Sequence, residues 1–158
     1  MNVGEWPARW AARYPDERYI VYGDLTLTKS EFNRRINRLA HAFQEIGLKK
    51  GDRFAALMAN SNVVLEVLLA LSKLGGIMVP LNFRLAAPEL AYILNDSEPM
   101  GIIYSPEFAA LVEELRGKVP SLKHYVREIE GGADADPLYE ELLTGKPEDE
   151  PVPDAEVT

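Results

Sequence analysis

The sequence contains no cysteine, which excludes disulfides, thiolate catalysis and zinc sites built on cysteine. It also has only two histidines, His41 and His124, which lie too far apart in the sequence to suggest a metal-binding motif. The absence of cysteine fits a protein that works in a reducing compartment.

Long hydrophobic runs are lacking as well. The most apolar segment, residues 63–74, is interrupted by Glu66 and Lys73, and it is shorter than the roughly 20 apolar residues that a membrane helix needs. The first residues lack the basic stretch and apolar run of a signal peptide. We therefore expect a soluble, cytoplasmic protein without a transmembrane segment.

The sequence has no excess of basic charge. Its formal net charge of −8 comes entirely from residues 131–158, which hold nine acidic residues and one lysine, while residues 1–130 are balanced. A balanced body without a basic stripe argues against a nucleic-acid partner. Residues 144–158 combine acidic residues with three prolines, which predicts an acidic, proline-rich linker that is solvated. An interaction tail is the alternative for this segment.

The motifs of common active sites are also missing. No glycine-rich loop follows a strand and opens a helix, and Gly75-Gly76 has the reverse order, at the helix end that repels anions. There is no Gly-x-Ser-x-Gly elbow. The pairs Glu113-Glu114 and Glu140-Glu141 are adjacent on expected helices, so their carboxylates point apart. We predict no catalytic residue and no metal ligand in this chain.

The sequence does contain a regular alternation of strands and helices. Expected strands begin at residues 53, 77, 100 and 124, and this spacing of 23–24 residues fits one strand, one helix and two short loops. Expected helices cover residues 61–74, 88–95, 106–116 and 138–143. Such alternation predicts an α/β fold with a mostly parallel sheet made of repeated strand-helix units.

Before this alternation, the sequence predicts a helix over 5–14, a hairpin over 19–28 and a helix over 29–46. Thr28 and Glu31 form a capping-box pattern at the start of the third element. Its arginines, at 34, 35 and 38, are expected on a wet helix surface. The helix over 61–74 is apolar nearly all round and is therefore expected to be buried. We assign residues 1–143 to one α/β subdomain that is part of a larger domain.

Four segments carry a family resemblance through their order and spacing. They are residues 25–32 (Leu-Thr-Leu-Thr-Lys-Ser-Glu-Phe), residues 47–55 (Gly-Leu-Lys-Lys-Gly-Asp-Arg-Phe-Ala), residues 68–85, which include Gly-Gly-Ile-Met-Val-Pro-Leu-Asn-Phe-Arg-Leu, and residues 89–97 (Glu-Leu-Ala-Tyr-Ile-Leu-Asn-Asp-Ser). Together they resemble the N-terminal part of the acyl-CoA synthetase, luciferase and peptide-synthetase adenylation superfamily. The third segment is more similar to the acyl-CoA ligases than to the peptide synthetases.

The resemblance implies a ligase that works in two half-reactions. A carboxylic acid, in the first place a fatty acid, attacks ATP to give an acyl-adenylate, and the thiol of coenzyme A then displaces AMP. Magnesium assists the first step by shielding the triphosphate. ATP, magnesium and coenzyme A are thus expected to serve the parent enzyme, and none is expected to bind tightly to this chain. The family's phosphate loop and its later catalytic residues would follow the linker over 144–158, so we expect this chain alone to be inactive.

One site residue follows from the resemblance. In some relatives the arginine of the Asn-x-Arg-Leu stretch touches a phosphate of coenzyme A, and here that residue is Arg84. A guanidinium offers forked donors to a phosphate, and ligands of α/β sheets bind beyond the carboxyl ends of the strands. A surface arginine or a structural salt bridge is the alternative interpretation.

Two other hypotheses remain open at this point. A truncated relative could act as a non-catalytic binding or partner module, because exposed parallel strands need a partner. A flavodoxin-like ligand domain is a second alternative, although residues 59–62 (Ala-Asn-Ser-Asn) offer no glycine for an anion. For the enzyme fragment, the expected partners are the rest of the parent polypeptide and a small carboxylic acid, and a homodimer is left open.

Overall fold

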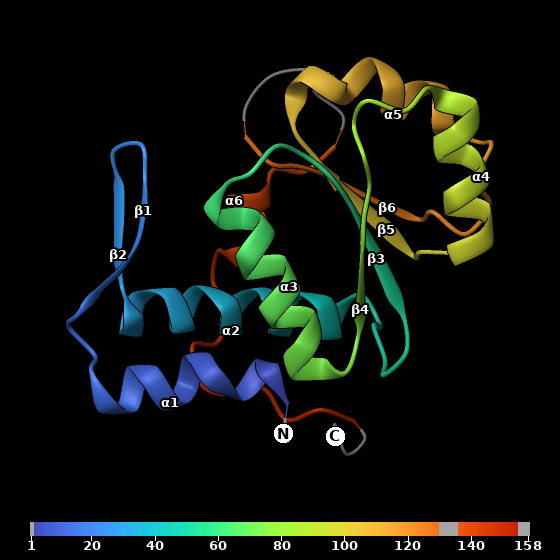
Figure 1. Cartoon of the computed structure of the whole chain (residues 1–158). Helices are drawn as coiled ribbons and strands as arrows, with labels where there is room; N and C mark the ends of the chain where they lie inside the picture. Colours follow the sequence, from blue (N-terminus) through green and yellow to red (C-terminus); the bar gives the residue numbers. More distant parts are fainter. Residues whose placement is uncertain (1, 130–135, 155–158) are drawn as a thin grey trace. The chain divides into compact units, whose positions relative to one another are not determined.

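The computed structural model describes residues 2–129 and 136–154, and the chain divides into two compact units (Figure 1). The first unit comprises residues 1–51, 61–76 and 143–158, and the second comprises residues 52–60 and 77–142. Each unit is described below by itself. The fold class is confirmed as α/β with a parallel sheet, an N-terminal helix and an antiparallel hairpin.

The first unit holds the N-terminal elements and one later helix. They are η1 (Val3–Glu5), α1 (Trp6–Arg13), β1 (Arg18–Tyr22), β2 (Leu25–Thr28), α2 (Lys29–Glu45) and α3 (Asn62–Leu74). The strands β1 and β2 pair antiparallel, as the sequence predicts. Gly23 opens their turn with a φ of 56°, a conformation that glycine adopts at little cost.

Helix α2 forms the centre of the first unit. The Thr28 hydroxyl accepts the Glu31 N–H at 3.2 Å, and the Glu31 carboxylate accepts the Thr28 N–H at 2.8 Å, which confirms the capping box. The apolar residues at helical spacing are all buried except the half-buried Ile46; they are Phe32, Ile36, Leu39, Ala40, Phe43 and Ile46. The helix therefore begins and packs as its sequence pattern predicts.

A chain of aromatic rings joins α1 to α2. Trp10 lies against Tyr19 of β1 with ring centroids 5.3 Å apart, and Tyr19 lies 5.5 Å from Phe32 of α2. Offset or tilted rings at this separation attract each other beyond the area that they bury. Trp10 of the first helix thus packs on the body of its own unit.

Helix α3 departs from the prediction of all-round burial. Leu65 and Leu68 are 44% and 38% exposed, whereas Glu66 and Lys73 are buried. The buried face of α3 is thus partly polar. Arg35 of α2, expected on a wet surface, instead donates to the Glu66 carboxylate at 2.9 Å. A buried carboxylate requires such a partner, which explains why Arg35 turns inward.

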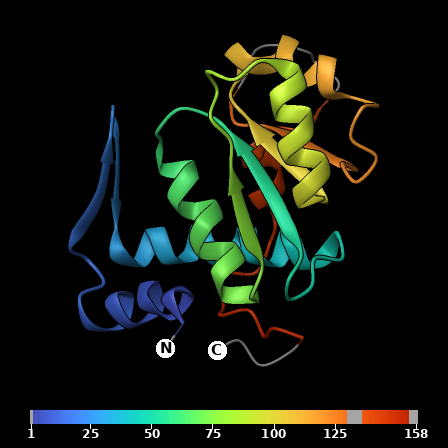
Figure 2. The same cartoon turned by 45° about the vertical axis from the view of Figure 1, so that its right-hand side comes forward.

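The second unit contains a parallel sheet in the order β4-β3-β5-β6. Its elements are β3 (Arg53–Leu57), β4 (Ile77–Pro80), α4 (Ala87–Ser97), β5 (Gly101–Tyr104), η2 (Pro106–Phe108), α5 (Ala109–Leu115), β6 (His124–Arg127) and α6 (Tyr139–Leu143). Figure 2 shows β3 in teal running beside β4 in green. The evenly spaced strand starts become neighbours, since Arg53 pairs with Ile77 and Gly101 pairs with His124.

The core of the second unit lies between this sheet and helices α4 and α5. Leu90, Leu94, Val112 and Leu115 of the helices pack with sheet residues in one buried cluster. Strand β4, in contrast, is only partly buried, because it lies at the edge of the sheet. Within residues 2–129 and 136–154, no helix has the length and hydropathy needed to cross a bilayer.

Gly4 lets η1 approach the backbone of α3 closely. A Cβ atom at this position would lie 2.5 Å from the backbone nitrogen of Lys73 and 2.7 Å from the carbonyl carbon of Ser72. We predict that Gly4→Ala lowers the free energy of unfolding by about 1–3 kcal/mol, because backbone atoms cannot move aside cheaply. Urea denaturation measures this loss. The exposed neighbour substitution Val3→Ala serves as the control and should change stability by less than about 0.5 kcal/mol.

Candidate functional site

Arg84, the predicted site residue, lies in the loop at the carboxyl edge of the sheet in the second unit. The loop after β4 begins at Leu81, whose N–H donates to the Ala56 carbonyl of β3 at 2.9 Å. The Asn82 side chain then accepts the Arg84 N–H at 3.0 Å, and the Asn82 carbonyl accepts the Leu85 N–H at 3.1 Å. Asparagine suits such a turn because its side chain replaces a backbone acceptor. The sequence Asn-Phe-Arg-Leu therefore folds into a local turn.

This turn leaves the Arg84 side chain exposed. Within the described part of the chain, its guanidinium has no hydrogen bond or ion pair, so the structural salt bridge is not formed there. An arginine without a protein carboxylate keeps all its donors available to an anion. The role of Arg84 in binding coenzyme A remains a prediction.

A stacked aromatic pair lies next to Arg84 in the sequence. The ring of Phe83 stacks on Phe108 of η2, with centroids 5.3 Å apart and an angle of 21° between the planes. Phe83 is nevertheless 42% exposed. The pair joins the loops that follow β4 and β5, and it presents an aromatic surface at the edge where α/β sheets bind ligands.

The N-terminus of α4 follows this loop but is not an anion site. The Glu89 carboxylate accepts the Ala86 N–H at 2.9 Å, which places a negative charge at the helix start. Pro88 lacks an N–H altogether. An anion at this edge would thus depend on the Arg84 guanidinium rather than on the helix dipole.

The ends of β5 and β6 are occupied by a network of charged and aromatic side chains. The Asp136 carboxylate accepts the Tyr104 hydroxyl and an Arg116 N–H, both at 2.7 Å, and Arg127 Nε donates to the Asp136 carbonyl at 2.8 Å. Arg116 also lies over the Tyr125 ring, 3.8 Å from its centroid. Burial, aided by the hydrogen bond to Asp136, raises the pKa of Tyr104 far above its ordinary value. These groups satisfy one another and are interpreted as structural.

We predict that Tyr104→Phe lowers the free energy of unfolding by about 1–2 kcal/mol, because the substitution leaves the buried Asp136 carboxylate without one donor. Equilibrium urea unfolding measures the change. Tyr92→Phe is the matched control, since Tyr92 is well exposed and its substitution should leave stability unchanged. Equal effects of both substitutions would contradict a structural role for the network.

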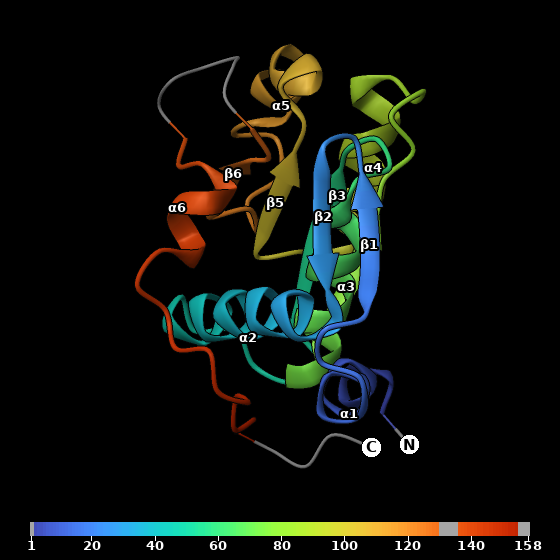
Figure 3. The same cartoon turned by 90° about the vertical axis from the view of Figure 1, so that its left-hand side faces the viewer.

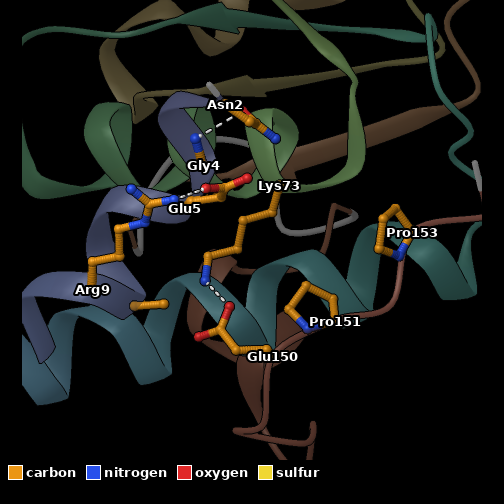
Figure 4. Close-up of a pocket in the computed structure, with 9 residues that line it drawn as sticks. Asn2, Gly4, Glu5, Arg9, Lys73, Glu150, Pro151 and Pro153 are labelled. Carbon is orange, nitrogen blue, oxygen red and sulfur yellow. Dashed lines mark hydrogen bonds and ion pairs between the residues drawn. The ribbon is translucent and has the colours of Figure 1, made fainter. Parts of the chain in front are cut away.

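A second polar cluster lies in the first unit and was missed by the sequence analysis. The Lys73 ammonium donates to the side-chain oxygen Oδ1 of Asn33 at 3.0 Å. It also donates to the Glu150 carboxylate, as Figure 4 shows. Asn33 and Asn37 donate to the other oxygen of that carboxylate at 2.8 and 3.0 Å. The Lys73 side chain is only 4% exposed, and that of Glu150 is 51% exposed.

The helix residues of the cluster, but not Glu150, could have been recognised from residue spacing. Asn33 and Asn37 lie four residues apart, and Glu66 and Lys73 lie seven apart, so each pair occupies one helix face. Two charges on an otherwise apolar helix require polar partners. The sequence analysis instead treated the helix as apolar nearly all round.

The pKa values in this cluster follow from burial and from its hydrogen bonds. Burial lowers the pKa of Lys73, and Glu150 offsets this effect only in part. Burial acts to raise the pKa of Glu150, but the hydrogen bonds from Lys73, Asn33 and Asn37 outweigh it, so the pKa lies below its ordinary value. The lowered pKa of Glu150 therefore favours its charged form near neutral pH.

Further contacts hold residues 146–152, here called the strap, beside α2 (Figure 3). Glu148 pairs with Arg38, and its carbonyl accepts from Asn37 at 2.7 Å. Gln44 donates to the Val152 carbonyl at 2.7 Å. The acidic residues of the predicted linker over 144–158 are exposed as far as Asp154. Several of them nevertheless bind side chains of α2. In the described ranges, no three His, Asp or Glu side chains gather closely enough to hold a metal ion.

The parallel sheet places the chain among the α/β proteins, a class in which ligands commonly bind beyond the carboxyl ends of the strands. The family model of the AMP-binding enzyme matches residues 7–157. The chain therefore belongs to the AMP-binding enzyme family, as its resemblance to the adenylate-forming synthetases predicts.

Curated relatives share this assignment. The chain is 41% identical over 115 residues to a feruloyl-CoA synthase of Amycolatopsis sp, covering 73% of this chain and 23% of the relative. It is 38% identical over 95 residues to the long-chain-fatty-acid–CoA ligase FadD13 of Mycobacterium tuberculosis, covering 60% of this chain and 19% of the relative. The chain thus spans about a fifth to a quarter of the length of these relatives.

Solved structures show the same fold. An anthranilate CoA ligase, AuaEII, in complex with anthranoyl-AMP superposes with a TM-score of 0.89 at 25% identity, covering 94% of this chain and 29% of that one. The N-terminal domain of FACL13 from Mycobacterium tuberculosis superposes with a TM-score of 0.85 at 31% identity, covering 98% and 38%. The architecture described above is therefore one portion of a larger ligase domain.

Proposed function

We propose that this chain is the N-terminal part of an ATP-dependent acid–thiol ligase that joins a carboxylic acid to coenzyme A in the cytoplasm. The observation that carries the proposal is the family match over residues 7–157 together with the relatives, which include a feruloyl-CoA synthase and a fatty-acid–CoA ligase. The proposed acid is a fatty acid in the first place, with aromatic acids as the class to compare.

The proposed chemistry has two steps. An oxygen of the carboxylate attacks the α-phosphorus of ATP, and pyrophosphate leaves as the acyl-adenylate forms. The thiol sulfur of coenzyme A then attacks the acyl carbonyl carbon, the acyl–oxygen bond to AMP breaks, and the thiol proton is lost. Bound magnesium would neutralise charge on the triphosphate. The described residues contain no ligand cluster for it, so we assign no step through the metal to this chain.

The contribution that we assign to this chain is a wall of the site for coenzyme A. The turn held by Asn82 exposes Arg84 at the carboxyl edge of the sheet, and this placement supports a contact with a coenzyme A phosphate. The stacked pair of Phe83 and Phe108 lies in the loops of the same edge. Neither feature supplies an acid, base or nucleophile, which supports the proposal that the chain is inactive alone.

The first test is an assay of pyrophosphate release with ATP and a panel of long-chain fatty acids, ferulate and anthranilate. We expect release by the whole parent polypeptide and none by residues 1–158. The acid that gives the fastest release identifies the substrate class. Activity of residues 1–158 alone would contradict the proposed dependence on later segments, and an inert parent polypeptide would contradict the ligase itself.

The second test concerns Arg84 in the parent enzyme. Arg84→Ala is expected to raise the KM for coenzyme A about ten-fold to a hundred-fold, because one charged hydrogen-bonding partner of a phosphate is lost. Adenylate formation, measured as pyrophosphate release before coenzyme A is added, should not change. Arg53→Ala is the control, since Arg53 is an exposed arginine at the amino end of β3. An unchanged KM in Arg84→Ala would exclude the contact.

A non-catalytic partner module is the second candidate. The strongly exposed apolar side chains Val21 and Tyr22 of the hairpin favour it, because such residues often mark a contact surface. Sedimentation of residues 1–158 distinguishes the two. A free module should be monodisperse, whereas a portion of a larger domain should dimerise or aggregate.

A further inference from the structure

The strap gives the first unit a feature that the ligase chemistry does not use. Its residue Glu150 places a carboxylate among donors from two helices, with Asn33 and Asn37 from α2 and Lys73 from α3. We propose that Asn33, Asn37 and Lys73 form a carboxylate-binding site for Glu150, and that occupation of this site holds the strap against α2.

The two asparagine donors are oriented differently, Asn33 by its bond with Lys73 and Asn37 by its bonds to the strap. Asn33 uses its carbonyl oxygen to accept from Lys73 at 3.0 Å, so its amide nitrogen faces the Glu150 carboxylate. Asn37 directs its amide nitrogen to the strap twice, toward the Glu150 carboxylate and the Glu148 carbonyl. A site whose inward-facing groups are all donors, around a buried ammonium, selects an acceptor with negative charge.

Open space lies next to the Lys73–Glu150 pair. A pocket of about 380 Å³ lies beside the site, lined by residues of η1 and α1, by Lys73, and by Glu150, Pro151 and Pro153 of the C-terminal segment. Glu5 and Arg9 at this pocket form their own ion pair at 2.6 Å. Figure 4 shows the Lys73 side chain pointing away from them toward Glu150. The Lys73 ammonium therefore pairs with Glu150 of the strap and not with Glu5.

The neighbouring acidic residues pair with side chains that are more exposed than Lys73. Asp149 is 79% exposed and lies 3.7 Å from the His41 ring, and Glu148 pairs with the partly exposed Arg34 and Arg38. Ion pairs at such surface positions contribute little to stability. Glu150 is thus the anchor of the strap, and the pairs of Glu148 and Asp149 are secondary.

Acid should release the strap by protonating Glu150. Its pKa in the bound state lies below the ordinary value of 4.5, so the anchor is complete above that pH and is lost as the pH falls through the lower value. The other ionisable groups facing the site and the strap are Lys73, Arg34, Arg38, Arg9, Glu5, Glu148, Asp149 and His41.

The experiment measures NMR order parameters of the amides of residues 148, 149, 150 and 152 in the whole parent polypeptide. We expect order parameters of about 0.85 at pH 7, falling below about 0.6 in Glu150→Gln. Asp149→Asn is the matched control, because it removes the same charge from the adjacent residue, and it should leave the values near about 0.85. Acid titration of the unmodified chain should release the strap with a midpoint below 4.5.

Lys73→Met tests the other side of the site and should free the strap to the same extent as Glu150→Gln. If Lys73→Met does not fold, Glu150→Gln decides the question, since its half-exposed side chain lies outside the core. A strap that stays ordered in Glu150→Gln overturns the proposal. Equal loss of order in Asp149→Asn and Glu150→Gln overturns it too, because general charge attraction would then explain the contact.

Discussion

The first unit depends on the burial of two charges that α3 carries on an otherwise apolar surface. Glu66 and Lys73 are both buried, and an unpaired charge in such a place would cost several kcal/mol. Arg35 of α2 neutralises the first, and the strap residue Glu150 neutralises the second. The position of α2 beside α3 and the course of the C-terminal segment are both fixed by this requirement, in addition to hydrophobic packing.

In the second unit, the constraint is the common direction of four strands. Because β3, β4, β5 and β6 are all parallel, their following loops gather at one edge. The structure uses this edge in two ways. The Asp136 network binds side chains at the ends of β5 and β6, while the turn after β4 leaves Arg84 exposed. This division separates a structural part of the edge from the part that we assign to the ligand.

The regular elements could be predicted closely from the sequence, because their signals are local. The capping box at Thr28 and the glycine after α3 mark helix ends, and the spacing of strand starts anticipates the parallel sheet. The family resemblance rests on the order of short motifs and was confirmed by the family match. Arg84 was placed at the strand end as expected, although its ligand remains a prediction.

The polar cluster could not be predicted in the same way, because its partners are distant in sequence. Asn33 and Glu150 are separated by 117 residues, and no local pattern links an amide on one helix to a carboxylate in a linker. The exposure of Leu65 and Leu68 has a related cause, since α3 turns its two charges inward and leaves two leucines outside. The residue pattern predicted a helix that is apolar nearly all round, whereas the buried face of α3 is partly polar.

The long separation between Lys73 and Glu150 also has a consequence for synthesis of the chain. These residues lie 77 positions apart, so at about 5–20 residues per second the ribosome reaches Glu150 roughly 4–15 s after Lys73. During this interval the nascent α3 carries an ammonium whose counter-charge has not been made. Water solvates the Lys73 ammonium, or a transient binding factor contacts it, during this time. The ion pair between Lys73 and Glu150 can form only after the end of the strap has been made.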